Sequence, residues 1–205
     1  MAVGRRLAFT GHIAGVGSGA GVGMVIGSWL QSPFGGFADV MVQDADGQRI
    51  LLAPTEQVAE FVSHTYYFDD VVVGPVSADH TADEFSVTAP GLTVTGRLGG
   101  AAPFDRLLRL VPRRVATAPA WLRAIDPVAS RLIPGVHTAG SARNGRREYY
   151  GVRRTRRIAS IDGNFRGVDL DGLAPLDPPV RFGFSSAPAL PQLVSVTTTI
   201  DVMTE

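Results

Sequence analysis

Arginine and tyrosine are interleaved over residues 149–158, which read Tyr-Tyr-Gly-Val-Arg-Arg-Thr-Arg-Arg-Ile. A guanidinium group binds carboxylates and phosphates through a planar fork of N–H donors, and a tyrosine ring adds apolar surface with a hydroxyl at its tip. These residue types in this order predict a binding site for an anion. The candidate ligand-binding residues are Tyr150, Arg153, Arg154, Arg156 and Arg166.

Histidine is the side chain whose ordinary pKa lies nearest neutrality, so it is the first candidate for moving protons. The chain has four histidines, at His12, His64, His80 and His137. His64 and His137 are the candidate acid/base groups of an enzyme. None of the four has a second histidine or a carboxylate at a spacing typical of metal ligands, so we predict no metal and no cofactor.

Several chemistries are excluded by composition. All 19 basic residues are arginine, and the chain has no lysine and no cysteine. No side chain can therefore form a Schiff base or act as a thiol nucleophile. Residues 15–20 match Gly-x-Gly-x-x-Ala, and residues 183–187 outline a serine-hydrolase elbow. Both motifs require a helix directly afterwards, and glycine or proline follows instead, so we predict neither function there.

Charge is strongly segregated although the formal net charge is zero. Residues 101–166 carry 14 arginines against four carboxylates, and the segments on either side are acidic. The acidic segments could fold over the basic middle and neutralise it, or the middle could offer a basic surface to an anion. Nucleic acid is not expected as a partner, because the net charge is zero and no nucleic-acid motif is recognisable.

The elements that must position these residues are predicted to be strands. Asn144-Gly145 is typical of a type I′ hairpin turn, and Asp162-Gly163 predicts a second turn. We therefore expect three antiparallel strands here, the middle one at 149–158. Because side chains alternate along a strand, Tyr150, Arg154 and Arg156 should share one face, with Arg153 on the other.

Further strands are predicted on both sides of this region. A hairpin is expected over 37–53 and a helix near 55–65 that Thr55 caps. Strands should follow at 71–73, which looks buried, and at 84–88, 92–97, 180–185 and 193–202, the last pairing with the first strand. The spacing predicts a mainly antiparallel β (α+β) fold whose sheet forms a barrel or a sandwich.

A helical insertion should interrupt the sheet near 103–133, within a single domain spanning 1–205 and with 101–135 as its insertion. Prolines stand at first-turn positions, and Arg106, Arg109 and Arg113 recur at helical spacing. The insertion could cover a barrel mouth or a sheet face. A mobile lid or a membrane-surface element is the alternative.

We expect a cytoplasmic protein. Arg5-Arg6 and the apolar residues after it outline an export signal, but no Ala-x-Ala cleavage pattern follows. No apolar segment reaches the roughly 20 residues that a membrane-spanning helix needs. A homo-oligomer is compatible with the sequence.

The leading hypothesis is a β-barrel that binds a small, partly apolar or amphipathic anion. Such a barrel resembles lipocalin-type ligand barrels in outline, and acetoacetate-decarboxylase-type barrels as well. The second resemblance implies Schiff-base chemistry, for which this chain has no lysine. One alternative is an enzyme that uses a histidine with arginines at an oxyanion. Another is an interaction protein without a pocket, whose Arg-rich and Tyr-rich strands face acidic loops, a partner protein or nucleic acid, and whose barrel interior is solidly packed.

Overall fold

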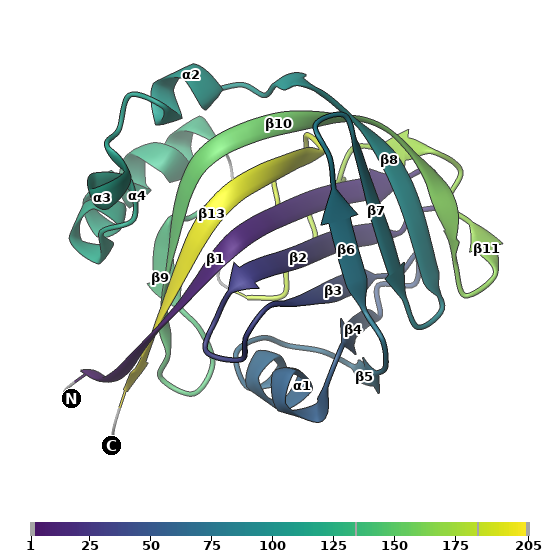
Figure 1. Cartoon of the computed structure of the whole chain (residues 1–205), viewed down its shortest axis with the longest axis horizontal. Coiled ribbons are helices and arrows are strands. Elements are labelled where there is room, and N and C mark those ends of the chain that lie inside the picture. The colour runs from purple at the N-terminus through teal and green to yellow at the C-terminus, as the bar shows by residue number, and fades with distance from the viewer. Residues whose placement is uncertain (1–2, 134, 184, 204–205) are drawn as a thin grey trace.

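A single large sheet curls into a half-barrel, with short helices at its edges (Figure 1). The computed structural model describes residues 3–133, 135–183 and 185–203. In these residues the strands are β1 (Val3–Ser18), β2 (Gly23–Gln31), β3 (Phe37–Gln43), β4 (Arg49–Ala53), β5 (Asp70–Val73), β6 (Ser77–His80), β7 (Glu84–Ala89), β8 (Leu92–Ala101), β9 (Ala139–Ser141), β10 (Arg147–Phe165), β11 (Val168–Asp169), β12 (Leu173–Ala174) and β13 (Gln192–Met203). The helices are α1 (Glu56–Ser63), α2 (Asp105–Leu108), α3 (Arg113–Ala116) and α4 (Pro119–Leu132).

The strand order along the sheet is β5-β4-β3-β2-β1-β13-β10-β8-β7-β6. Neighbours run antiparallel except β4 and β5, which are parallel. The central pair joins the two strands farthest apart in the chain, with β1 and β13 in register from Arg5 opposite Val202 to Gly15 opposite Gln192. The prediction of a mainly antiparallel, barrel-like fold is confirmed, as is the pairing of the last strand with the first.

The curl brings β6, at one end of the sheet, back toward β2 and β3 near the other end. The Ser28 hydroxyl on β2 donates a hydrogen bond to the carbonyl oxygen of Ala78 on β6 at 3.1 Å. Among the described residues no backbone ladder joins these strands. The sheet therefore folds around an interior without closing into a full barrel.

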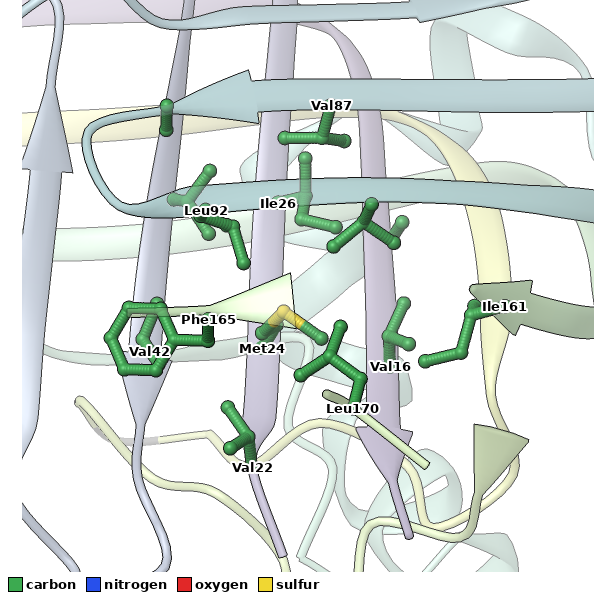
Figure 2. Close-up of a cluster of buried hydrophobic side chains, with 14 of the residues drawn as sticks. Val16, Val22, Met24, Ile26, Val42, Val87, Leu92, Ile161, Phe165 and Leu170 are labelled. Atoms are coloured by element: carbon green, nitrogen blue, oxygen red, sulfur yellow. The ribbon is translucent and has the colours of Figure 1, made fainter. Parts of the chain in front are cut away.

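Aliphatic side chains fill a large part of that interior (Figure 2). Alternate residues of β7 point inward, at Phe85, Val87 and Ala89, while the residues between them are exposed. This is the period of two expected for a sheet with one buried face. Met24 from β2 and Leu170 from the loop after β11 complete the cluster. The interior is therefore packed with side chains, as the alternative without a pocket predicts.

Helix α1 covers the outer face of β3 and β4. The Thr55 hydroxyl accepts a hydrogen bond from the backbone N–H of Val58, which confirms the predicted cap. Val58 and Val62 pack on Leu51 of β4.

The predicted helical insertion is confirmed as three short helices, α2 to α4, which gather beside β10 at one end of the half-barrel (Figure 1). A Cβ at Gly151 on β10 would lie 2.8 Å from the carbonyl oxygen of Ala116, so glycine lets the end of α3 touch the strand. At the start of α2, the Asp105 carboxylate accepts the backbone N–H of Thr155 at 2.9 Å. The insertion is thus fixed to β10 at two points.

The predicted turn at Asn144-Gly145 is confirmed, with φ values of 55° and 69° between β9 and β10. The turn predicted at Asp162-Gly163 is wrong, because β10 continues through it to Phe165. A Cβ at Gly163 would lie 2.0 Å from the carbonyl oxygen of Thr93 on β8, so this glycine serves close strand approach. The chain reverses instead at Arg166-Gly167, where both φ values are positive.

Three other expectations are corrected. A bulge at Arg153 interrupts the alternation along β10, so Tyr150 and Arg154 do not share a face. Residues 180–183 and 185 are irregular instead of a strand, because flanking prolines lack backbone N–H groups, and Val180 packs against the outer face. Strand β5 lies at the sheet edge, and Val71 is exposed there instead of buried.

Candidate functional site

Three of the predicted arginines have partners within the chain. Arg154 Nε lies 3.2 Å from a carboxylate oxygen of Asp105. Arg156 donates to the carbonyl oxygen of Gly99 through Nε at 3.1 Å, and Arg166 pairs with Asp70 at 3.2 Å. These contacts anchor α2, hold β8 to β10 and join the turn after β10 to the start of β5. A ligand-binding role for these three arginines stays a prediction.

Arg153 is placed differently, because it is the extra residue of the β10 bulge. Val152 lies opposite Val196 and Arg154 opposite Ser195, which leaves Arg153 without a cross-strand partner. Its Nε is buried and has no hydrogen-bond partner among the described residues. Burial lowers the pKa of Arg153, and the positive charge of Arg113 on α3 lowers it further. The bulge therefore holds a partly buried cation in a repulsive environment.

His12 lies on the inner face of β1, opposite Ser195 of β13 and close enough to feel the charge of Arg153. Its Nδ1 is buried and also has no hydrogen-bond partner within the described part of the chain. Burial lowers the pKa of His12 to about 4, and the nearby His80 and Arg153 contribute in the same direction. The His80 ring on β6 packs edge-on at a centroid distance of 4.1 Å.

A small cavity of about 20 Å³ lies beside His12 and His80. It has room for about one water molecule. Its walls are polar at Ser28 and apolar at Ala14, Ile26 and Leu193. An open hollow of about 510 Å³ adjoins it, since Asp79, His80 and Phe85 line both spaces. The hollow extends over polar side chains of β7, β8 and β10, including Ser86, Thr95 and Arg97.

Tyr150 belongs to a second polar cluster, on the outer side of the sheet. Its hydroxyl donates to Glu148 at 3.2 Å, and the Tyr66 hydroxyl donates to the other carboxylate oxygen at 2.7 Å. Glu148 is 0% exposed. Burial raises the pKa of Glu148 to about 7, against the opposing effect of the two tyrosine hydrogen bonds and of Arg146. This carboxyl group therefore titrates near neutrality inside the protein.

The two predicted acid/base histidines have different surroundings. His64 lies at the C-terminal end of α1, with Nδ1 2.6 Å from the carbonyl oxygen of Glu60. His137 Nδ1 lies 3.2 Å from Asp126, and the same carboxylate accepts the backbone N–H of Ala139. Burial opposes ionisation of Asp126, but the hydrogen bonds from His137 and the backbone leave its pKa below the usual value. His137 is thus oriented by a carboxylate, whereas His64 only ends a helix.

The structure brings together residues that the sequence did not connect. The rings of His12 on β1 and His80 on β6 meet because the sheet curls, and Arg153 lies two strands from β1 on β10, close enough to lower the pKa of His12. No local pattern predicts that meeting. Glu148 was also missed, although it stands two residues before Tyr150 on the same strand. Among the residues the structure describes, no group of three histidine or carboxylate side chains is arranged to hold a metal ion.

Comparison with known proteins gives fold likeness alone. No family model matches the chain. No curated protein matches it either. Acetoacetate decarboxylase from Legionella pneumophila is similar with a TM-score of 0.44 at 8% identity, covering 98% of this chain and 86% of that one. A putative AttH from Nitrosomonas europaea has a TM-score of 0.34 at 12% identity, covering 98% of this chain and 52% of that one. In residues 3–133, 135–183 and 185–203, no helix is long and apolar enough to cross a membrane.

Proposed function

We propose that this protein binds a small, partly apolar anion at the inner mouth of the half-barrel, with Arg153 and His12 as its anchors. The observation that carries the proposal is the pair of buried nitrogens, His12 Nδ1 and Arg153 Nε, neither of which has an acceptor among the described residues. Buried polar groups are nearly always hydrogen-bonded, and Arg153 is close enough to lower the pKa of His12, so an acceptor that both nitrogens share would account for the two exceptions.

An anion supplies what these groups lack. An unpaired, partly buried cation costs stability, and Arg113 adds repulsion to Arg153. A carboxylate or phosphate between Arg153 and His12 accepts hydrogen bonds from both and offsets that repulsion. It also favours protonation of His12, whose pKa of about 4 reflects burial and neighbouring positive charge. Binding should therefore be accompanied by proton uptake.

The surroundings favour a ligand with a short apolar part. Ile26, Phe85 and Val87 line the small cavity beside His12 on its apolar side. The packed core behind them leaves no room for a long chain in the centre. The rest of the ligand would lie in the open hollow beyond His80. Because the cavity beside His12 holds about one water molecule, binding would require side chains around it to move, and a single-chain carboxylate of medium length is the probe that tests this.

The first measurement is the mass of the purified protein under native conditions and again after denaturation. A discrete mass that is lost on denaturation would be the bound molecule. Equal masses would leave the site to be tested by adding octanoate and titrating by calorimetry.

Replacing Arg153 with glutamine is expected to weaken octanoate binding about 10- to 100-fold, because a hydrogen bond to a charged group contributes roughly 1.5–3 kcal/mol. The matched control is Arg157→Gln, an exposed arginine of the same strand. His12→Gln should weaken binding as well and abolish the rise in affinity from pH 8 to pH 5 that proton uptake predicts. Circular dichroism confirms that each variant is folded. Equal affinity in the Arg153 variant and the Arg157 control would reject the assignment.

The Asp126 and His137 pair supports an alternative function, an enzyme that uses His137 as its acid/base group. General acid/base catalysis contributes about 10²- to 10⁴-fold to a rate. His137→Gln is therefore expected to lower turnover of a test substrate, such as a 4-nitrophenyl ester, at least 100-fold. His64→Gln is the control, because its ring only contacts a helix carbonyl. Equal turnover in the two variants would exclude this mechanism.

A further inference from the structure

Helix α4 carries an apolar stripe that is partly exposed to solvent. Trp121, Ile125, Val128 and Leu132 recur at i, i+4, i+7 and i+11, which places them on one side of a helix. Trp121 is 37% exposed, and Leu132 and Val128 are about half exposed. The side chain that fixes α4 to the body is instead Leu122, the residue of this helix that is buried.

The two shorter helices also carry exposed apolar side chains. Leu107 on α2 is 56% exposed and Leu110, just after it, is 78% exposed. Phe104 and Val115 are exposed as well. Helices α2, α3 and α4 gather at one end of the molecule (Figure 1), so these exposed apolar residues come from neighbouring elements. Single exposed apolar residues are normal, but a gathered set indicates an interaction surface.

The charge of the same region is positive. Six arginines lie in residues 101–135, at Arg106, Arg109, Arg113, Arg114, Arg123 and Arg131. The two acidic residues of this segment are already engaged. Asp105 accepts hydrogen bonds from Thr155 and Arg154, and Asp126 from His137 and the backbone after it. The outward charge of the insertion is therefore strongly basic, although the whole chain is neutral.

We infer that the insertion α2–α4 binds the surface of an anionic phospholipid bilayer. Apolar side chains, tryptophan among them, enter the boundary between headgroups and acyl chains, while arginines pair with lipid phosphates. The positive charge of the insertion favours an anionic bilayer over a second copy of this chain as the partner of this surface. A second copy docked symmetrically on the same face would place one set of six arginines against another, and such like-charge contact is unfavourable.

The fluorescence of Trp121 can report membrane binding by the insertion. It has two tryptophans, and Trp29 packs against the Phe9 ring and donates to Asp39, so its surroundings are protein. Trp121 is the one that membrane binding would transfer from water. Vesicles of phosphatidylcholine with 30% phosphatidylglycerol should shift the emission to shorter wavelength, and phosphatidylcholine alone should not. Trp121→Phe should remove the shift while the protein still floats with the vesicles.

Flotation of variants tests the surface directly. Leu107→Ser together with Leu110→Ser is expected to lower vesicle binding about 10-fold or more per leucine, because burying such a side chain is worth roughly 1.5–3 kcal/mol. Leu30→Ser is the matched control, since Leu30 is 65% exposed and belongs to β2, which is not part of the insertion. Arg106→Gln and Arg109→Gln should each reduce binding to the anionic vesicles about 5-fold, and added salt should do the same.

Three results would overturn the inference. The first is no flotation with anionic vesicles. The second is equal loss in the Leu30 control and in the double leucine variant. The third is that light scattering shows a dimer for the wild type and a monomer for the double leucine variant. The face would then be covered by a second copy. None of these readouts depends on octanoate, so they stand apart from the ligand proposal.

Discussion

Replacing Glu148 with glutamine is expected to stabilise the protein by about 3 kcal/mol at pH 8 and by no more than about 1 kcal/mol at pH 5. Glu148 is fully buried and its pKa is raised to about 7, from an ordinary value of 4.5. The folded state therefore binds more protons than the unfolded state between these two values. By linkage, stability is retained below about pH 4.5 and falls as pH rises through 7, at about 1.4 kcal/mol for each unit of pKa difference.

Glutamine keeps the shape of the site and removes the titration. Its carbonyl oxygen can accept from Tyr66, and its amide can donate to the hydroxyl oxygen of Tyr150. Free energies of unfolding from urea titrations at pH 5, 6, 7 and 8 check the prediction. Asp39, whose pKa is also raised by burial to about 7, is present in both proteins. The variant should therefore still lose some stability over this pH range, but less than the wild type does. Parallel pH profiles for the wild type and the variant would contradict it.

A matched control separates burial from charge. Glu60 is an exposed carboxylate on α1, and Glu60→Gln should leave the pH profile of the wild type unchanged. If both glutamine variants changed the profile equally, the cause would be net charge and not the buried site.

Replacing Leu170 with alanine is expected to destabilise the protein by about 3–5 kcal/mol. Leu170 is 0% exposed and closes one end of the packed interior, next to Met24 and Val16 (Figure 2). Its backbone holds it there, because its N–H donates to Gly163 and its carbonyl oxygen accepts from Ala20. Removing a fully buried leucine side chain loses transfer free energy and leaves a cavity that the fixed backbone cannot fill.

The control for Leu170 stands two residues earlier in the chain. Val168 is 63% exposed, so Val168→Ala should change the free energy of unfolding by less than about 0.5 kcal/mol. Urea denaturation of both variants at pH 6 measures the difference. If the two variants were equally stable, Leu170 would not close the core.

Much of the fold could be predicted because its signals are local. Asn144-Gly145 predicts its turn from the φ values that these residue types tolerate, and Thr55 predicts a helix start from one hydroxyl. The wrong turn at Asp162-Gly163 has a local cause as well. A glycine that lets two strands approach closely cannot be distinguished by sequence from a glycine that a turn requires. The sequence does not show that Thr93 of the neighbouring strand lies against Gly163.

The site was less predictable because it depends on contacts between distant strands. The bulge at Arg153 changes which arginines face the interior, and no sequence pattern marks it. His12 and His80 meet through the curl of the whole sheet. Glu148 could have been noticed, since it shares a strand face with Tyr150. However, a single glutamate among arginines in the sequence usually indicates a surface ion pair.

The position of β13 also determines the order of folding. This strand lies between β1 and β10 at the centre of the sheet, yet it leaves the ribosome after every other strand that the structure describes. Until then β1 and β10 each expose a long edge of unpaired backbone groups, which are templates for association with other chains. The central pairings also join residues that are far apart in sequence, which makes folding slow. Newly made chains should therefore depend on chaperones for as long as β13 remains inside the ribosome exit tunnel.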